Sequence, residues 1–169
     1  MQDAANRNQA AMRAMAAGDL VGAEAALLHA VGIAQNYLPA WLNLAAVRRQ
    51  RNDLDGAFEA IRQALTLDGR NFGALMMSAT MLEREGHAVP AALAYGAALA
   101  NAPPDESVDA ATLQAIRRGR EVHGAYTKQL GEHIHGTIAA AESDCTAAER
   151  RRIDSFIKMT LRVQPRYQQ

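Results

Sequence analysis

The chain has 169 residues, enough for one domain or a short array of repeats, and its formal net charge at neutral pH is zero. A neutral chain is a poor general binder of nucleic acid, because such binding requires an excess of basic residues. Hydrophobic residues make up 49% of the sequence and aromatic residues only 5%, so the composition favours closely packed alanine-rich helices over a β-sandwich.

The compartment is predicted from the cysteine content and from the apolar stretches. Cys145 is the single cysteine, so a disulfide within the chain is impossible, as suits a reducing cytoplasm. The first residues carry an early acid and no continuous apolar run, unlike a signal peptide. The most apolar stretch, residues 89–102, is too short to span a bilayer. We therefore expect a cytoplasmic protein with no membrane segment.

An internal repeat organises the first hundred residues. The segments GDLVGAEAALLHAV, NDLDGAFEAIRQAL and GHAVPAALAYGAAL begin 34 residues apart, at Gly18, Asn52 and Gly86. Alanines recur in phase within them, and so does a large apolar position occupied by Leu27, Ile61 and Tyr95. A helix–turn–helix period of 34 residues is typical of tetratricopeptide repeats. The sequence thus predicts an all-α solenoid of three repeats, at about 4–37, 38–71 and 72–105, with a generic alanine-rich bundle as the alternative.

Turn and cap residues support the repeat boundaries. Gly18, Asn52 and Gly86 fall between the two helices of each repeat, where a tight or left-handed turn is needed. Asp19 and Asp53 follow, and we expect their side chains to cap the second helix. Repeat 2 carries the helix pattern of the family best, although Arg48 stands where the family usually has tyrosine.

Residues 106–169 depart from the period. Asp105 or Ser107 is predicted to cap a long helix with apolar residues mostly four apart, ending near Ala141 and followed by a turn at 142–144. The sequence Thr146-Ala-Ala-Glu149 is a capping-box pattern and predicts a final helix. This segment either caps the apolar face of repeat 3 or connects the repeats to a further domain.

The order of these segments resembles the N-terminal region of bacterial aspartyl/asparaginyl β-hydroxylase-family proteins. The residues that carry the resemblance are 41–53, 64–86, 91–106 and 151–169. The resemblance implies a tetratricopeptide region that precedes an iron(II)- and 2-oxoglutarate-dependent dioxygenase domain and helps to recruit its substrate. The histidines that would surround the iron cannot be assigned in this sequence, so Fe(II) and 2-oxoglutarate are expected only if a catalytic domain follows.

Catalysis by the chain itself is the weaker hypothesis. His133 and His135 form the only metal-like pair, but residues two apart on a helix point to different faces. Cys145 has arginines nearby at 150–152, but sequence proximity does not supply the base that a nucleophilic thiol needs. We therefore expect no enzyme activity and no metal site in this chain; a free-standing adaptor or scaffold remains an alternative to the hydroxylase region.

Partner binding is predicted in a groove lined by the first helix of each repeat, as in the tetratricopeptide family. Amides there can bind an extended backbone, methionines adapt to varied side chains, and arginines can pair with carboxylates. The groove positions, counted from the repeat phase, are Asn8, Gln9, Met12, Asn43, Ala46, Arg49, Met76, Met77, Thr80 and Arg84. We expect a polypeptide partner and no nucleic acid.

A chaperone-tail clamp is not expected. In co-chaperone relatives of the family, a clamp for a C-terminal carboxylate uses three basic residues and two asparagines. Its positions hold Asn8, Met12, Asn43, Gly73 and Met77 here. Only Asn43 agrees with the clamp pattern.

Overall fold

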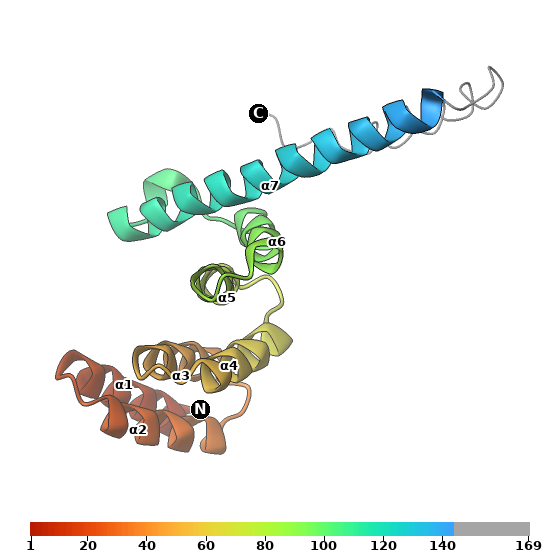
Figure 1. Ribbon diagram of the computed structural model, residues 1–169. Coiled ribbons are helices and arrows are strands. Elements are labelled where there is room, and N and C mark those ends of the chain that lie inside the picture. The colour runs from red at the N-terminus through yellow and green to blue at the C-terminus, as the bar shows by residue number, and fades with distance from the viewer. Residues whose placement is uncertain (144–169) are drawn as a thin grey trace. The chain divides into compact units, whose positions relative to one another are not determined.

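The computed structural model describes residues 1–143, with side chains described to residue 137 (Figure 1). This part of the chain is all-α, as predicted, and contains no strand. Its helices are α1 (Gln2–Ala16), α2 (Leu20–Ile33), α3 (Leu38–Gln50), α4 (Leu54–Leu67), α5 (Phe72–Arg84), α6 (Ala88–Leu99), the short 3-10 helix η1 (Asp105–Ser107) and α7 (Ala110–Ser143).

Helix pairs follow one another with the period of the sequence. The second helices α2, α4 and α6 begin at Leu20, Leu54 and Ala88, which are 34 residues apart. Each pair packs closely on itself, α1 on α2, α3 on α4 and α5 on α6, and neighbouring pairs meet through α2–α3 and α4–α5. This consecutive helix–turn–helix packing gives a solenoid-like arrangement.

The turns within the pairs have the predicted left-handed geometry. Gly18, Asn52 and Gly86 have φ angles of 80°, 62° and 79°. Asparagine tolerates this region better than other residues with a side chain, which explains the one position without glycine. The predicted caps are also confirmed, because Asp19 and Asp53 accept hydrogen bonds from the Gly22 and Gly56 backbone amides at 2.8 and 3.0 Å.

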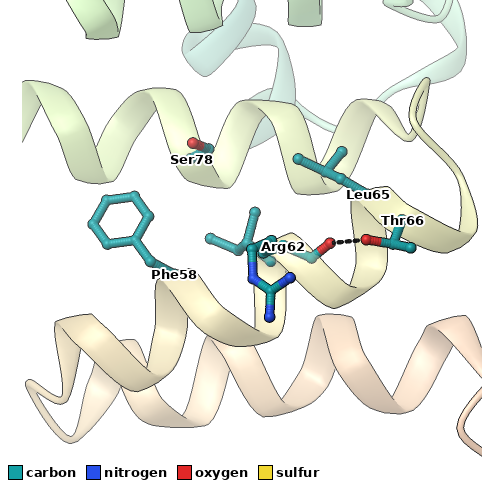
Figure 2. A pocket seen from close by; sticks show the side chains of 6 residues that line it. Phe58, Arg62, Leu65, Thr66 and Ser78 are labelled. Carbon is teal, nitrogen blue, oxygen red and sulfur yellow. Dashed lines mark hydrogen bonds between the residues drawn. The ribbon is translucent and has the colours of Figure 1, made fainter.

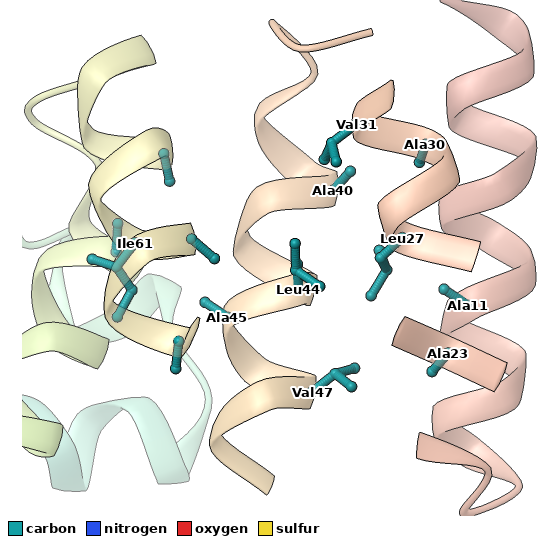
Figure 3. Close-up of a cluster of buried hydrophobic side chains, with 14 of the residues drawn as sticks. Ala11, Ala23, Leu27, Ala30, Val31, Ala40, Leu44, Ala45, Val47 and Ile61 are labelled. Carbon is teal, nitrogen blue, oxygen red and sulfur yellow. The ribbon is translucent and has the colours of Figure 1, made fainter. Parts of the chain in front are cut away.

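A first hydrophobic cluster joins the first two helix pairs. Figure 3 shows Leu27 of α2 and Leu44 of α3 pointing toward one another, and both side chains are fully buried. Most of their buried neighbours are alanines, such as Ala11, Ala23 and Ala45. Small side chains let the helix backbones approach closely, so a few large residues supply most of the buried apolar area.

A second cluster joins the third helix pair to the first part of α7. Its fully or nearly fully buried members include Tyr95 of α6 and Ile116 of α7, and Val122 packs against them. Residues 1–126 form one compact unit that contains both clusters. Within this unit, the first part of α7 therefore packs against the third pair.

The start of α7 differs from the prediction. Asp105 and Ser107 belong to η1, and the helix is capped by Asp109, whose Oδ1 accepts a hydrogen bond from the Thr112 backbone amide at 2.7 Å. The helix also continues to Ser143, so the turn predicted over 142–144 is wrong for its first two residues. The predicted final helix and Cys145 lie outside the described residues. No helix within 1–143 is both long and apolar enough to cross a membrane.

A pair of glycines in α7 tests the contact with α6. A Cβ atom on the buried Gly119 would lie 2.7 Å from Cδ1 of the Tyr95 ring, whereas a Cβ on Gly124 would meet nothing within 4 Å. Gly119→Ala is expected to lower the free energy of unfolding by about 1–3 kcal/mol through overpacking. Gly124→Ala is expected to raise it by up to about 1 kcal/mol, because alanine is the better helix former. Urea unfolding followed by circular dichroism checks both, and equal shifts would contradict the close contact.

Candidate functional site

The first helices of the first two pairs lie side by side at two asparagines. Asn43 Nδ2 on α3 donates a hydrogen bond to Asn8 Oδ1 on α1 at 2.8 Å. Asn8 is only 7% exposed, and its own amide contacts the Met12 sulfur at 3.9 Å. The Asn8 side-chain amide is thus engaged in contacts within the protein. The side-chain oxygen of Asn43, Oδ1, has no hydrogen-bond partner among the described residues.

Four other predicted groove residues lie on the same two helices. Gln9 is exposed and Met12 is 53% exposed, so both are open to a partner. Ala46 is half-buried on α3. Arg49 is also half-buried, and its Nε atom is buried without a hydrogen-bond partner in the described part of the chain.

The predicted groove residues on α5 differ in how deeply they are buried. Met76 is 8% exposed and belongs to the second cluster, whereas Met77 packs against the first. The two methionines thus face different parts of the core, as their adjacency on a helix predicts. The Thr80 hydroxyl donates to the Met77 backbone oxygen at 3.0 Å, and Arg84 is exposed. The packing between α1 and α3 is not repeated to the same extent between α3 and α5.

The neighbours of Arg49 in the predicted basic run have a structural role. Arg48 Nε donates to Glu24 Oε1 at 2.9 Å, and Arg48 Nη1 donates to the Gly56 backbone oxygen at 3.1 Å. Arg51 also forms an ion pair with Glu24, whose side chain is 12% exposed. These contacts tie α2 to the end of α3 and to α4, so Arg48 helps to hold the first two helix pairs together.

A hollow of about 370 Å³ lies between α4 and α5 (Figure 2). Phe58, Ile61 and Leu65 give it an apolar wall, and Ser78 faces them from α5. The Arg62 guanidinium at its edge is bound by Glu59, and hydrogen bonds from Arg62 and then Gln63 lower the Glu59 pKa to about 2. The lining contains no carboxylate, histidine or cysteine.

A buried phenol joins the third helix pair to α7. Tyr95 Oη donates to Glu83 Oε2 at 2.6 Å, and Arg118 binds Glu83 Oε1 through Nε and Nη2 at 2.9 and 2.6 Å. The hydrogen bond from Tyr95, followed by that from Arg118, lowers the pKa of Glu83. Burial, followed by the hydrogen bond to Glu83, raises the pKa of Tyr95. Every member is engaged with the others, which makes this a structural network.

The histidines of the enzyme alternative lie on α7. His133 and His135 are both exposed on α7. Within the part of the chain that the structure describes, no three His, Cys, Asp or Glu residues lie close enough to hold a metal ion.

Comparison with known proteins adds no assignment. No protein-family model matches the chain, and no curated protein matches it.

Proposed function

We propose that the chain is a polypeptide-binding module of the tetratricopeptide type, with its partner lying along α1, α3 and α5. The observation that carries the proposal is the 34-residue succession of helix pairs whose first helices α1 and α3 lie side by side. In repeat arrays of this kind, one row of helices forms an extended surface suited to a polypeptide.

The chemistry along α1 and α3 suits an extended segment. Gln9 is exposed, and the side-chain oxygen of Asn43 accepts no hydrogen bond within the described residues. Both side chains can therefore form hydrogen bonds with the backbone of a partner. Met12 offers an adaptable apolar contact beside them. Residues that bind a backbone through amides and side chains through methionine select for an extended conformation more than for one sequence.

The sequence resemblance favours a role for this module within a larger protein. In that role, it recruits a substrate to an aspartyl/asparaginyl β-hydroxylase-like domain. Fe(II) and 2-oxoglutarate would then act in that domain and not in this chain. Reading the gene beyond codon 169 tests this setting. A following β-rich region with iron-spaced histidines supports it, whereas a stop codon leaves a free-standing adaptor.

The helices α1, α3 and α5 are called the binding row below. A bulky residue placed on this row should block binding of the partner. Gln9→Trp is expected to weaken capture of any peptide held along α1 by about tenfold or more, because a bound segment must pass this exposed position. Ala25→Trp is the matched control, since Ala25 is also exposed but lies on α2, outside the row. Binding is measured by fluorescence anisotropy with peptides selected from a random display library, after circular dichroism has verified folding. Equal affinities for the two variants would contradict the assignment of the row.

A further inference from the structure

The arginines of the described residues fall into two groups. Five are held in ion pairs within the chain: Arg48 and Arg51 with Glu24, Arg62 with Glu59, Arg118 with Glu83 and Glu121, and Arg120 with Asp105. Arg49 on α3 and Arg84 on α5, both on the proposed binding row, form no ion pair among the described residues. Arg7 and Arg13 on α1, Arg70 before α5 and Arg117 on α7 also form no ion pair there. The row therefore carries positive charge that the chain itself does not neutralise.

Most acidic residues lie elsewhere, although Glu85 directly follows α5. Helices α1, α3 and α5 contain only Asp3 and Glu83, and both Glu83 oxygens are already bound by Tyr95 and Arg118. The acids of the first two repeats lie mainly on the second helices and their caps, namely Asp19, Glu24, Asp53, Asp55 and Glu59. The chain is neutral in total, yet its charges are segregated, so the row attracts anions while the molecule as a whole does not.

Arg49 shows this imbalance at the level of one atom. Its Nε is buried and lacks an acceptor in the described residues, whereas Nε of the preceding Arg48 donates to Glu24 at 2.9 Å. A buried donor left without an acceptor is unfavourable, and more so when it is charged. The Arg49 Nη atoms are not buried in this way and form no hydrogen bond among the described residues, so they can bind a carboxylate from outside the chain through two parallel hydrogen bonds.

We propose that the partner is an acidic polypeptide segment, with an Asp or Glu side chain held by Arg49 and further carboxylates attracted by Arg84. The inference rests on the proposed function, and charge complementarity carries it. The carboxylates belong to side chains within the segment and not to its C-terminus, because the clamp that would bind a terminal carboxylate is not present at Met12, Gly73 and Met77.

The first experiment separates this inference from the proposed function. The full chain is applied to an array of end-blocked peptides of about 15 residues, roughly 50 Å when extended. The peptides form three sets, with Asp and Glu, with Asn and Gln at the same positions, or with Lys at those positions. Selective retention of the acidic set, reduced by high salt, supports the inference. Retention without charge preference overturns it and leaves the proposed function intact, whereas retention of no peptide overturns both.

The second experiment assigns the binding to Arg49. The tightest acidic peptide is titrated by anisotropy against Arg49→Gln and against Arg62→Gln, which removes the same charge from the outer helix α4. We expect Arg49→Gln to weaken binding about tenfold or more, as for loss of one charge-assisted hydrogen bond, and Arg62→Gln to change it less than about twofold. Arg49→Lys should recover part of the loss, because it restores the charge but not the paired donors. Equal effects of the two glutamine variants, with folding unchanged by circular dichroism, overturn the assignment.

Discussion

Leu27→Ala is expected to lower the free energy of unfolding by about 2–5 kcal/mol, the range for a buried leucine replaced by alanine. Leu27 is fully buried in the first cluster and faces Leu44 across the contact between α2 and α3 (Figure 3). Most of the neighbouring buried side chains are alanines, which have no rotatable atoms with which to fill a cavity. The cavity therefore persists, and the loss should fall in the upper part of the range.

Leu28 supplies the control, since it is the next residue of α2 and is 46% exposed. Leu28→Ala removes the same atoms, so its free energy of unfolding is expected to change far less, by roughly 0.5 kcal/mol. Urea unfolding is followed by Trp41 fluorescence, because this single tryptophan packs against the first cluster and donates to the Gln35 backbone oxygen at 2.7 Å. Similar losses in the two variants would mean that Leu27 is not the core residue of this helix.

The repeat period could be predicted because its determinants are local. Gly18, Asn52 and Gly86 occupy left-handed turns that few other residues tolerate, and Asp19 and Asp53 cap the helix that follows. The start of α7 could not be predicted as well. Three residues that can cap a helix occur within five positions, at 105, 107 and 109, and their order gives no preference. The structure selects Asp109, because residues 105–107 complete a 3-10 turn after Pro104.

The candidate site was predicted only as a set of positions. Repeat phase places Asn8 and Asn43 on corresponding helices, but not the hydrogen bond that consumes the Asn8 amide. The repeat phase also does not distinguish Arg48 from Arg49. In the structure, Arg48 forms an ion pair with Glu24, whereas Arg49 forms none among the described residues. Such pairing depends on how neighbouring helices lie against each other, which periodicity within one helix does not encode. The one sequence feature that could have indicated this ion pair is Glu24, which is the only acidic residue in α2.

Tyr95→Ala is expected to lower the free energy of unfolding by about 3–5 kcal/mol, the range for a buried aromatic ring. Tyr95 is 1% exposed and is the largest fully buried side chain among the described residues. Its ring also fills the space beside Gly119, so truncation removes the contact of the ring with α7. Tyr95→Phe keeps the ring and removes only the hydrogen bond to Glu83, which should cost about 1.5–3 kcal/mol because the acceptor is charged.

The pH dependence separates the hydrogen bond of Tyr95 from its packing. The Glu83 pKa is lowered in the folded protein, so its contribution is present above the unfolded carboxyl pKa of about 4.3 and is lost as the pH falls through the folded value. The Tyr95 pKa is raised, so its contribution is present below the unfolded phenol pKa of about 10 and is lost at higher pH. The difference in free energy of unfolding between the natural protein and Tyr95→Phe should thus be largest between about pH 4.3 and about pH 10. It should become smaller at lower pH and at higher pH.

Unfolding of the Tyr95 variants is best followed with two probes, because Trp41 belongs to the first cluster and Tyr95 to the second. In a repeat array, stability is approximately the sum of local terms and of contacts between neighbours, so a lesion in one pair need not unfold the next. We expect circular dichroism to detect the loss in Tyr95→Ala at lower urea than Trp41 fluorescence does. Coincident transitions would show that the contact between α4 and α5 couples the two clusters fully. A pH-independent difference for Tyr95→Phe would contradict a contribution from the hydrogen bond between Tyr95 and ionised Glu83.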